Sequence, residues 1–241
     1  MGRNVIVRSI PNVLTICNLL SGCGAMVAAF SGSFDEALGW IVLGCVFDFF
    51  DGFAARLLGV SSRLGVELDS LADVVTSGVA PATMLYAFLS EHVDGRGWEW
   101  VPYLSFLLAA FAAYRLSKFN IDERQHAGFL GLPTPANALF WAALTVTLSV
   151  WLCPGKALQG WLLAGLLLLV VVACVLMVCE RPMMALKFKN WSFRENKLRY
   201  VFLLGALALL LLFGVLGLAC SVVWYVSLSV TLYRQPKNCE R

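Results

Sequence analysis

Charged residues are scarce in this sequence: they make up 14% of its 241 residues, while hydrophobic residues make up 60%. Soluble globular domains have about 25% charged and about 45–50% apolar residues, so the composition excludes that class, and the apolar excess also excludes intrinsic disorder. A strong excess of basic residues is lacking too, since 18 basic against 15 acidic residues excludes nucleic-acid binding driven by bulk charge. The mean hydropathy of +0.79 instead indicates a polytopic membrane protein.

Ligand-forming patterns of cysteine and histidine are also missing. The 8 cysteines include no CxxC pair, and most lie in or beside apolar runs, so we interpret them as small buried side chains with free thiols. The 2 histidines, His92 and His126, are isolated, and no pattern marks either as a metal ligand.

Long apolar runs dominate what is present. A helix that crosses a membrane needs roughly 20 mostly apolar residues. Such runs lie near residues 12–31, 37–57, 72–90, 101–119, 137–153, 160–179, 199–213 and 215–233. The last two belong to one stretch that is too long for an ordinary span, and Gly214 and Gly217 offer a place to turn. We therefore predict an all-α polytopic membrane protein with about eight transmembrane helices, with seven as the alternative.

Basic residues are distributed unevenly among the predicted loops. With the N-terminus in the cytoplasm, all of the 18 basic residues except Arg96 and Lys156 face the cytoplasm. The outer loops carry acidic residues instead, namely Asp35, Glu36, Glu91, Asp94 and Glu99. Because the Lys and Arg bias sets orientation, we predict that both termini lie in the cytoplasm. Seven helices would place Arg234, Lys237 and Arg241 outside, so eight helices fit better.

One loop differs from the others in composition. Residues 183–199 interleave basic side chains with aromatic and other apolar ones. This mixture is typical of a segment that lies at the interface with anionic headgroups, and it is equally consistent with an ordinary cytoplasmic loop.

Four aspartates lie at neighbouring ends of two predicted helices. Asp48 and Asp51 close the second apolar run, and Asp69 and Asp73 open the third. Spacings of three and four residues place each pair on one helical face, and the short connection between the helices allows the two pairs to meet. Four ionised carboxylates need a neutralising partner at such close range, and magnesium, manganese or calcium prefers oxygen ligands of this kind. The alternative is that these residues cap helix ends without metal.

Residues between the two aspartate pairs suit a phosphate group. Gly52 permits close approach of a ligand to the backbone, and Arg56 is a planar donor that matches phosphate oxygens. Gly59 and Gly65 loosen the connecting loop. Carboxylates for metal, together with metal and arginine for phosphate, are the groups that phosphoryl-type transfer requires.

These residues together resemble a known signature. Every fixed position of the motif of the CDP-alcohol phosphotransferases is present, as Asp48-x-x-Asp51-Gly52-x-x-Ala55-Arg56, eight residues, and Gly65-x-x-x-Asp69-x-x-x-Asp73. The resemblance implies that an alcohol displaces CMP from a CDP-linked lipid. It also implies that the four aspartates bind two divalent ions, Mg²⁺ or Mn²⁺, and that Asp73 is the general base. Gly52, Arg56 and Ser62 would hold the CDP group, with Asn12 at the start of the first helix closing over the nucleotide.

Two later segments resemble a narrower group. The basic-Phe-Asn run that ends at Asn120, and the run Gly131-Leu132-Pro133-Thr134-Pro135-Ala136, are similar to segments of the bacterial and archaeal integral-membrane phosphatidylserine synthases. This resemblance covers most of residues 8–200, which we expect to form the catalytic core of a single membrane-embedded domain, residues 1–241. The last two helices, about 199–233, are expected to be peripheral.

Serine is a zwitterion, so its site needs a cation for the carboxylate and an acceptor for the ammonium. Arg115, Lys118 and Asn120 lie on the predicted cytoplasmic side with the aspartates, and they are candidates for contacts to serine or to a lipid phosphate. The alternative is that Arg115 and Lys118 are cations that extend from a helix end toward the membrane surface.

The sequence therefore predicts an enzyme of the cytoplasmic (cell) membrane whose active site faces the cytoplasm and whose substrates are CDP-diacylglycerol and L-serine, with a homodimer as the state that the resemblance implies. Two alternatives stay open. Another acceptor, glycerol 3-phosphate or inositol phosphate, would use the same chemistry. A cation transporter would instead use the aspartates as an ion path, but it predicts carboxylates spread through the depth of the bilayer.

Overall fold

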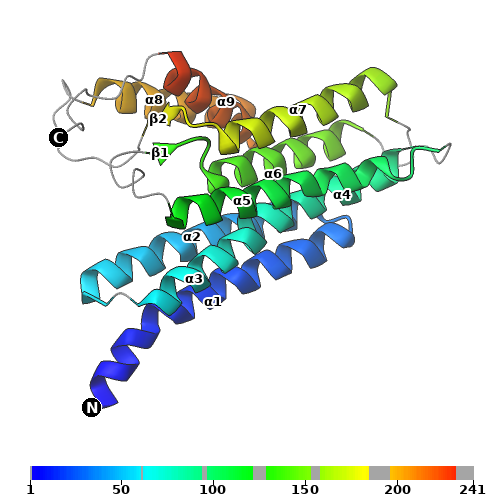
Figure 1. Cartoon of the computed structure of the whole chain (residues 1–241). Helices are drawn as coiled ribbons and strands as arrows, with labels where there is room; N and C mark the ends of the chain where they lie inside the picture. The colour runs from blue at the N-terminus through cyan, green and yellow to red at the C-terminus, as the bar shows by residue number, and fades with distance from the viewer. Residues whose placement is uncertain are drawn as a thin grey trace.

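The computed structural model describes residues 2–60, 62–93, 97–121, 129–152, 158–184 and 196–231, with the backbone alone for 2–8 and 129. Most of these residues are helical (Figure 1), which confirms the all-α class. Several residues that entered the sequence argument lie outside the described residues: Asp94, Arg96, Arg124, His126, Lys156, 185–195, Arg234, Lys237 and Arg241.

The predicted apolar runs coincide with helices. The elements are α1 (Gly2–Phe30), α2 (Phe34–Leu58), α3 (Arg63–Asp73), η1 (Val74–Val79), α4 (Ala80–His92), η2 (Val101–Phe106), α5 (Leu107–Ile121), β1 (Phe129–Leu130), α6 (Thr134–Trp151), α7 (Gly160–Val178), β2 (Pro182–Met183), α8 (Lys197–Phe213) and α9 (Val215–Thr231). α3, η1 and α4 form one continuous helical rod, called the third rod because it follows α1 and α2. The 3₁₀ turns of η2 lead directly into α5. Figure 1 shows α1 to α7 running along one common direction across the molecule.

Two helices begin earlier in the chain than the apolar runs that predicted them. α1 begins at Gly2 rather than near residue 12, so Pro11 lies inside the helix. The third rod begins at Arg63 rather than near residue 72, and it carries Asp69 and Asp73 on a helix as predicted. An apolar window misses α3 because this helix is amphipathic. Its start is instead set by Ser62, whose Oγ accepts a hydrogen bond from the Gly65 amide at 2.9 Å.

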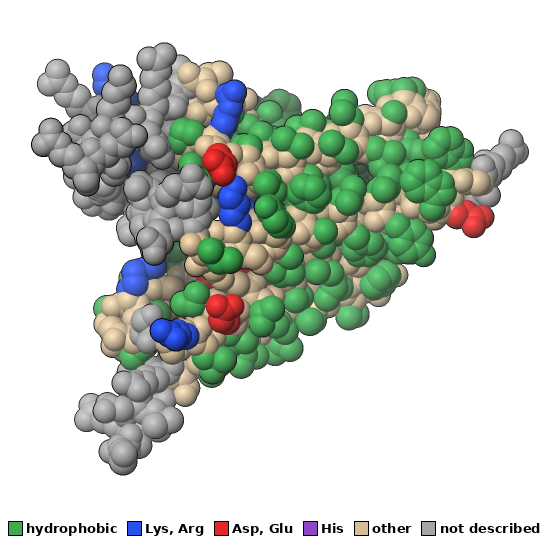
Figure 2. Space-filling model, viewed as in Figure 1, with side chains coloured by type: hydrophobic (Ala, Val, Ile, Leu, Met, Phe, Trp, Pro, Cys, Tyr) green, Lys and Arg blue, Asp and Glu red, His purple; other side chains and the backbone are tan. Residues whose placement is uncertain are grey.

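Among the residues that the structure describes, three helical segments are long and apolar enough to cross a membrane: Ser9–Phe30, Arg63–His92 and Gly160–Val178. α2 has 25 residues, but acidic side chains lie at its start and again at Asp48 and Asp51. Figure 2 shows hydrophobic side chains covering the middle of the visible face, while most of the Lys, Arg, Asp and Glu side chains gather at the end where α2 ends and α3 begins. An apolar belt with a charged end is the surface of a membrane protein.

The core lies where α1, α2, α4 and α6 meet. Its members on α1 and α2 are mostly small, such as Ala25, Ala29 and Ala37, whereas larger side chains come from α4 and α6, including Phe88 and the fully buried Trp141. Small residues allow helix backbones to approach closely, which is how helices associate when lipid offers no hydrophobic driving force. α1 is central to this arrangement, because it packs against α2, α3, η1 and α4.

The segment η1 is a π-helical turn inside the third rod. It begins directly after Asp73, and the Ala80 amide bonds back to the Val75 carbonyl, five residues earlier. Pro81 supplies a reason, because it has no amide hydrogen and its ring would collide with the carbonyl four residues before it in an α-helix. Thr76, Ser77 and Gly78 of this turn are buried. Such turns frequently lie at functional sites.

A short ladder attaches the segment before α6 to the end of α7. β1 pairs antiparallel with β2, and the Gly131 amide donates to the Arg181 carbonyl at 3.0 Å. Gly131 has a φ of +72°, and a Cβ atom there would lie 2.6 Å from the Met177 carbonyl oxygen. Only glycine fits both conditions, so the Gly-Leu-Pro-Thr-Pro-Ala segment is held in one place by its first residue.

The apolar stretch at the end of the described chain folds as a helical hairpin. Gly214, with a φ of +55°, separates α8 from α9, and a Cβ atom at Gly217 would lie 2.1 Å from the Leu209 carbonyl oxygen. This confirms that the stretch forms two helices rather than one. α8 has no buried residue, whereas α9 contributes Tyr225 to the core and packs against α6.

Candidate active site

Three of the four predicted aspartates converge. Asp48 and Asp51 of α2 and Asp69 of α3 each offer a carboxylate oxygen, and these oxygens all lie within 4.8 Å of one another. Asp51 is 5% exposed, and the other two are half-buried. The sequence spacing achieves this, because residues three apart share a helical face and α2 and α3 are joined by a short turn.

The fourth aspartate, Asp73, lies one helical turn beyond Asp69 on α3. It is half-buried, and its Oδ1 accepts a hydrogen bond from Asn18 Nδ2 at 3.1 Å. It is not one of the three carboxylates of the close group. Asp73 is thus held by α1 beside the three aspartates whose carboxylate oxygens all lie within 4.8 Å of one another.

The donor set of the group fits a divalent cation. Three carboxylates at this separation repel one another strongly when ionised, and burial removes much of the water that would screen them. Asp69 Oδ1 is buried and has no hydrogen-bond partner among the described residues. Hard oxygen ligands in this number are what Mg²⁺, Mn²⁺ or Ca²⁺ requires, and an ion would satisfy both the repulsion and the unpaired oxygen.

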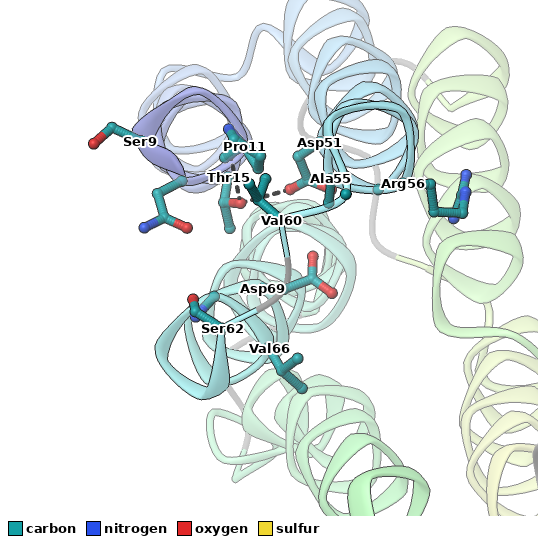
Figure 3. Close-up of a pocket in the computed structure, with 14 residues that line it drawn as sticks. Ser9, Pro11, Thr15, Asp51, Ala55, Arg56, Val60, Ser62, Val66 and Asp69 are labelled. Carbon is teal, nitrogen blue, oxygen red and sulfur yellow. Dashed lines mark hydrogen bonds between the residues drawn. The ribbon is translucent and has the colours of Figure 1, made fainter. Parts of the chain in front are cut away.

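A cavity of about 760 Å³ opens beside these carboxylates (Figure 3). Asp51 and Asp69 lie in its wall, and the rest of the lining comes from α1, from the end of α2 and from the start of α3. All four residues predicted to contact CDP line this cavity: Asn12, Gly52, Arg56 and Ser62. Its size is that of a pocket for a ligand as large as a nucleotide.

The glycines of the motif keep this cavity open. A Cβ atom at Gly65 would lie 3.1 Å from Ser62 Oγ and 3.3 Å from Asn12 Oδ1, so these two polar groups meet over a residue without a side chain. At Gly52, a Cβ atom would lie 3.4 Å from Arg56 Nη1, so the guanidinium lies over the glycine one turn earlier. Figure 3 shows the exposed Arg56 side chain turned away from the pair formed by Thr15 and Asp51.

α1 supplies two residues that the sequence argument missed. Thr15 Oγ1 lies 2.6 Å from Asp51 Oδ2 and donates to it, and Asn18 donates to Asp73 as described. Both side chains are buried, at 3% and 0% exposed. A signal was available, because Asn12, Thr15 and Asn18 are each three residues apart and so fall within about 120° of one another on an α-helix, among mostly apolar neighbours.

The structure does not bring the three predicted acceptor contacts together. Arg115 is buried, at 7% exposed, and its guanidinium is within electrostatic reach of Asp73. Lys118 Nζ instead forms an ion pair with Glu180 Oε1 at 2.8 Å, beyond the end of α7. Asn120 Nδ2 donates to Ser70 Oγ at 2.8 Å, which ties α5 to α3.

A known protein family matches the part of the chain that contains these residues. Residues 8–172 match the family model described as CDP-alcohol phosphatidyltransferase, which is more than half of the chain. The chain belongs to this family. The match confirms the resemblance that the aspartate motif carries, and it contains all four aspartates and the lining of the cavity. α8 and α9 lie beyond the residues that match the CDP-alcohol phosphatidyltransferase model.

Several CDP-alcohol phosphatidyltransferase relatives carry the same printed name, CDP-diacylglycerol–serine O-phosphatidyltransferase. The protein of Mycobacterium tuberculosis (strain ATCC 25618 / H37Rv) is 34% identical over 170 residues, 67% of this chain and 57% of that protein. That of Bacillus subtilis (strain 168) is 35% identical over 142 residues, 57% of this chain and 76% of that protein. That of Methanocaldococcus jannaschii is 37% identical over 131 residues, 54% of this chain and 57% of that protein. The chain thus spans little more than half the length of two of these relatives.

Proposed function

We propose that this protein transfers the phosphatidyl group of CDP-diacylglycerol to the hydroxyl of L-serine and releases CMP, which makes it a phosphatidylserine synthase. The observation that carries the proposal is the three-carboxylate group in the wall of the 760 Å³ cavity, whose lining includes every predicted nucleotide contact. Family membership supports the reaction type, and the shared name of the relatives supports serine as the acceptor.

Two divalent cations, Mg²⁺ or Mn²⁺, are proposed to be held by Asp48, Asp51, Asp69 and Asp73. When bound, they neutralise the diphosphate and stabilise charge on the attacking and leaving oxygens. Asn12 and Ser62 offer hydrogen bonds to the nucleotide from opposite sides of Gly65. Arg56 reaches phosphate oxygens as a two-pronged donor, and the bare Gly52 beside it lets the diphosphate approach the backbone of α2.

The serine oxygen is proposed to attack the β-phosphorus. A new oxygen–phosphorus bond forms, the bond from that phosphorus to the bridging oxygen breaks, and CMP leaves with the bridging oxygen. Asp73 accepts the proton of the serine hydroxyl as the general base. Its position supports this role, because Asp73 lies outside the close group of three carboxylates but on the same helix as Asp69.

The buried Arg115 is proposed to receive the serine carboxylate. Its Nε atom has no hydrogen-bond partner among the described residues, and its charge interacts with Asp73. A buried guanidinium with an unused donor fits a small carboxylate ligand beside the base. Lys118 and Asn120 would reach serine only by giving up their bonds to Glu180 and Ser70.

We further propose eight membrane-crossing helices with both termini and the aspartates on the cytoplasmic side of the cell membrane, in a single domain over residues 1–241. The distribution of Lys and Arg supports this orientation. In the described part of the chain, α2 ends and α3, α6 and α8 begin at the same end of the molecule (Figure 1). A homodimer is part of this proposal and follows from the family alone.

CMP release tests the proposal. Purified protein in detergent, with CDP-diacylglycerol and Mg²⁺, should release CMP only when L-serine is present, and a chelator or Asp69→Ala should abolish the release. Glu67→Ala is the matched control, because this acidic residue of the same helix is exposed and lies outside the cavity lining. CMP release only with glycerol 3-phosphate or inositol phosphate would overturn the acceptor. Cation uptake by proteoliposomes with no CMP release would overturn the enzyme class.

A further inference from the structure

Asn18 is a polar residue in the middle of an apolar helix, and it is fully buried. Its side chain donates to Asp73 Oδ1 at 3.1 Å, and its backbone carbonyl accepts a hydrogen bond from Thr76 Oγ1 at 2.8 Å. Asn18 therefore connects α1 to the last residue of α3 and to the π-helical turn η1 that follows it.

Thr76 is itself held on two sides by glycines. A Cβ atom at Gly22 of α1 would lie 2.7 Å from Thr76 Oγ1, and a Cβ atom at Gly44 of α2 would lie 2.4 Å from Thr76 Cγ2. Both distances are shorter than van der Waals contact, so any larger residue at either position would displace Thr76. The two glycines form a notch that fixes Thr76 and, through it, the carbonyl of Asn18.

Gly44 also leaves room for the Asn18 amide. A Cβ atom at Gly44 would lie 3.0 Å from Asn18 Oδ1, so the amide oxygen packs against this glycine. The amide nitrogen, at the other end of the same planar group, points to Asp73. Asn18 Oδ1 is buried and has no hydrogen-bond partner among the described residues. Leaving a buried acceptor unpaired costs stability, and the bond from the amide nitrogen to Asp73 offsets part of that cost.

We propose that Asn18, seated by Gly44 and Thr76, is the positioning residue for Asp73. The amide hydrogen occupies Oδ1 and holds the carboxylate in one orientation, so the proton of the acceptor alcohol goes to Oδ2. This inference rests on the proposed function, in which Asp73 is the general base.

The experiment replaces Asn18 by leucine, which keeps the branched shape of the side chain and removes the donor. The full chain in detergent is assayed for serine-dependent CMP release, and Mn²⁺ binding is measured directly by electron paramagnetic resonance. We expect kcat to fall by about 10- to 100-fold, which is less than the roughly 100- to 10,000-fold that general-base catalysis contributes, because the base itself stays in place. The KM for CDP-diacylglycerol and Mn²⁺ binding should change by less than about 3-fold.

Ser21→Ala is the matched control. Ser21 lies one turn further along α1, is 2% exposed, and bonds only to the Cys17 carbonyl of its own helix. It should retain wild-type kcat and Mn²⁺ binding. Wild-type kcat in Asn18→Leu would overturn the inference, and so would an equal loss of Mn²⁺ binding, because the residue would then support the metal site rather than the base.

A second pair of variants keeps the test independent of any folding defect in Asn18→Leu. Gly44→Ala places a methyl group against Thr76 Cγ2 and should lower kcat. Adding Thr76→Ser removes that methyl group and keeps the hydroxyl that bonds to Asn18. Only the 3.0 Å approach of the new Cβ atom to Asn18 Oδ1 then remains, so the double variant should regain part of the lost kcat. A double variant no better than Gly44→Ala would overturn the proposed chain of contacts. Absence of serine-dependent CMP release by the wild type would refute the proposed function instead.

Discussion

Replacing Thr15 by valine should weaken metal binding without changing the shape of α1. The Thr15 hydroxyl donates to Asp51 Oδ2 at 2.6 Å, and both side chains are buried, at 3% and 5% exposed, so water cannot take its place. A hydrogen bond to a charged group contributes about 1.5–3 kcal/mol, which corresponds to about 10- to 100-fold in a binding constant. Residues that orient metal ligands show losses of the same size. We therefore expect Thr15→Val to raise the Kd for Mn²⁺ by about 10- to 100-fold.

The measurement is a Mn²⁺ titration followed by electron paramagnetic resonance, with CMP release recorded on the same samples. Excess Mn²⁺ should restore most of the kcat, because the variant loses affinity and not the base. Thr145→Val is the control, since Thr145 is fully buried but bonds only to the Trp141 carbonyl of its own helix. Equal Mn²⁺ affinity in Thr15→Val and the wild type would refute the reasoning, as would an equal loss of affinity in the control.

Two further changes probe the region around the acceptor. Gly131→Ala places a Cβ atom at a φ of +72° and 2.6 Å from the Met177 carbonyl oxygen, so it should lower stability by at least about 1–2 kcal/mol; a thermal-unfolding midpoint in detergent equal to that of the wild type would contradict this. Lys118→Met breaks an ion pair whose side chains are 29% and 56% exposed, so stability should change by less than about 1 kcal/mol and the KM for serine by less than about 3-fold. A much larger rise in that KM would place Lys118 in the serine site.

Hydropathy predicted the helices well but not where the third rod begins. Each apolar run coincides with a helix because burial in lipid requires about 20 apolar residues whatever the neighbours are. Residues 63–71 escaped this criterion, because α3 alternates between the cavity and the exposed surface. Its start depends on a local signal instead, the Ser62 cap, which composition does not register.

Some residues of the candidate site could be predicted from local sequence patterns, and others could not. Asp48, Asp51 and Asp69 were predictable because their spacing follows from helix geometry alone. The contacts of Thr15 and Asn18 with the aspartates depend on which face of α1 turns toward α2 and α3. In the sequence, only the spacing of the polar residues Asn12, Thr15 and Asn18 indicates that face. The ion pair between Lys118 and Glu180 joins residues 62 positions apart, and no local pattern predicts such a contact.

The π-helical turn η1 sets the rotation of Asp69 and Asp73 about the helix axis relative to α4. Each residue of an α-helix advances the chain by about 100°, so the extra residue that a π-turn accommodates rotates everything before it relative to everything after it. Buried side chains such as Met84, Leu85 and Phe88 fix the orientation of α4 in the core. The π-turn therefore changes the orientation of α3 about the helix axis and leaves that of α4 unchanged. α4 can thus meet the packing demands of the core while Asp69 still faces α2. If residues 63–92 formed a regular α-helix, either α4 would lose its core contacts or Asp69 would turn away from Asp48 and Asp51.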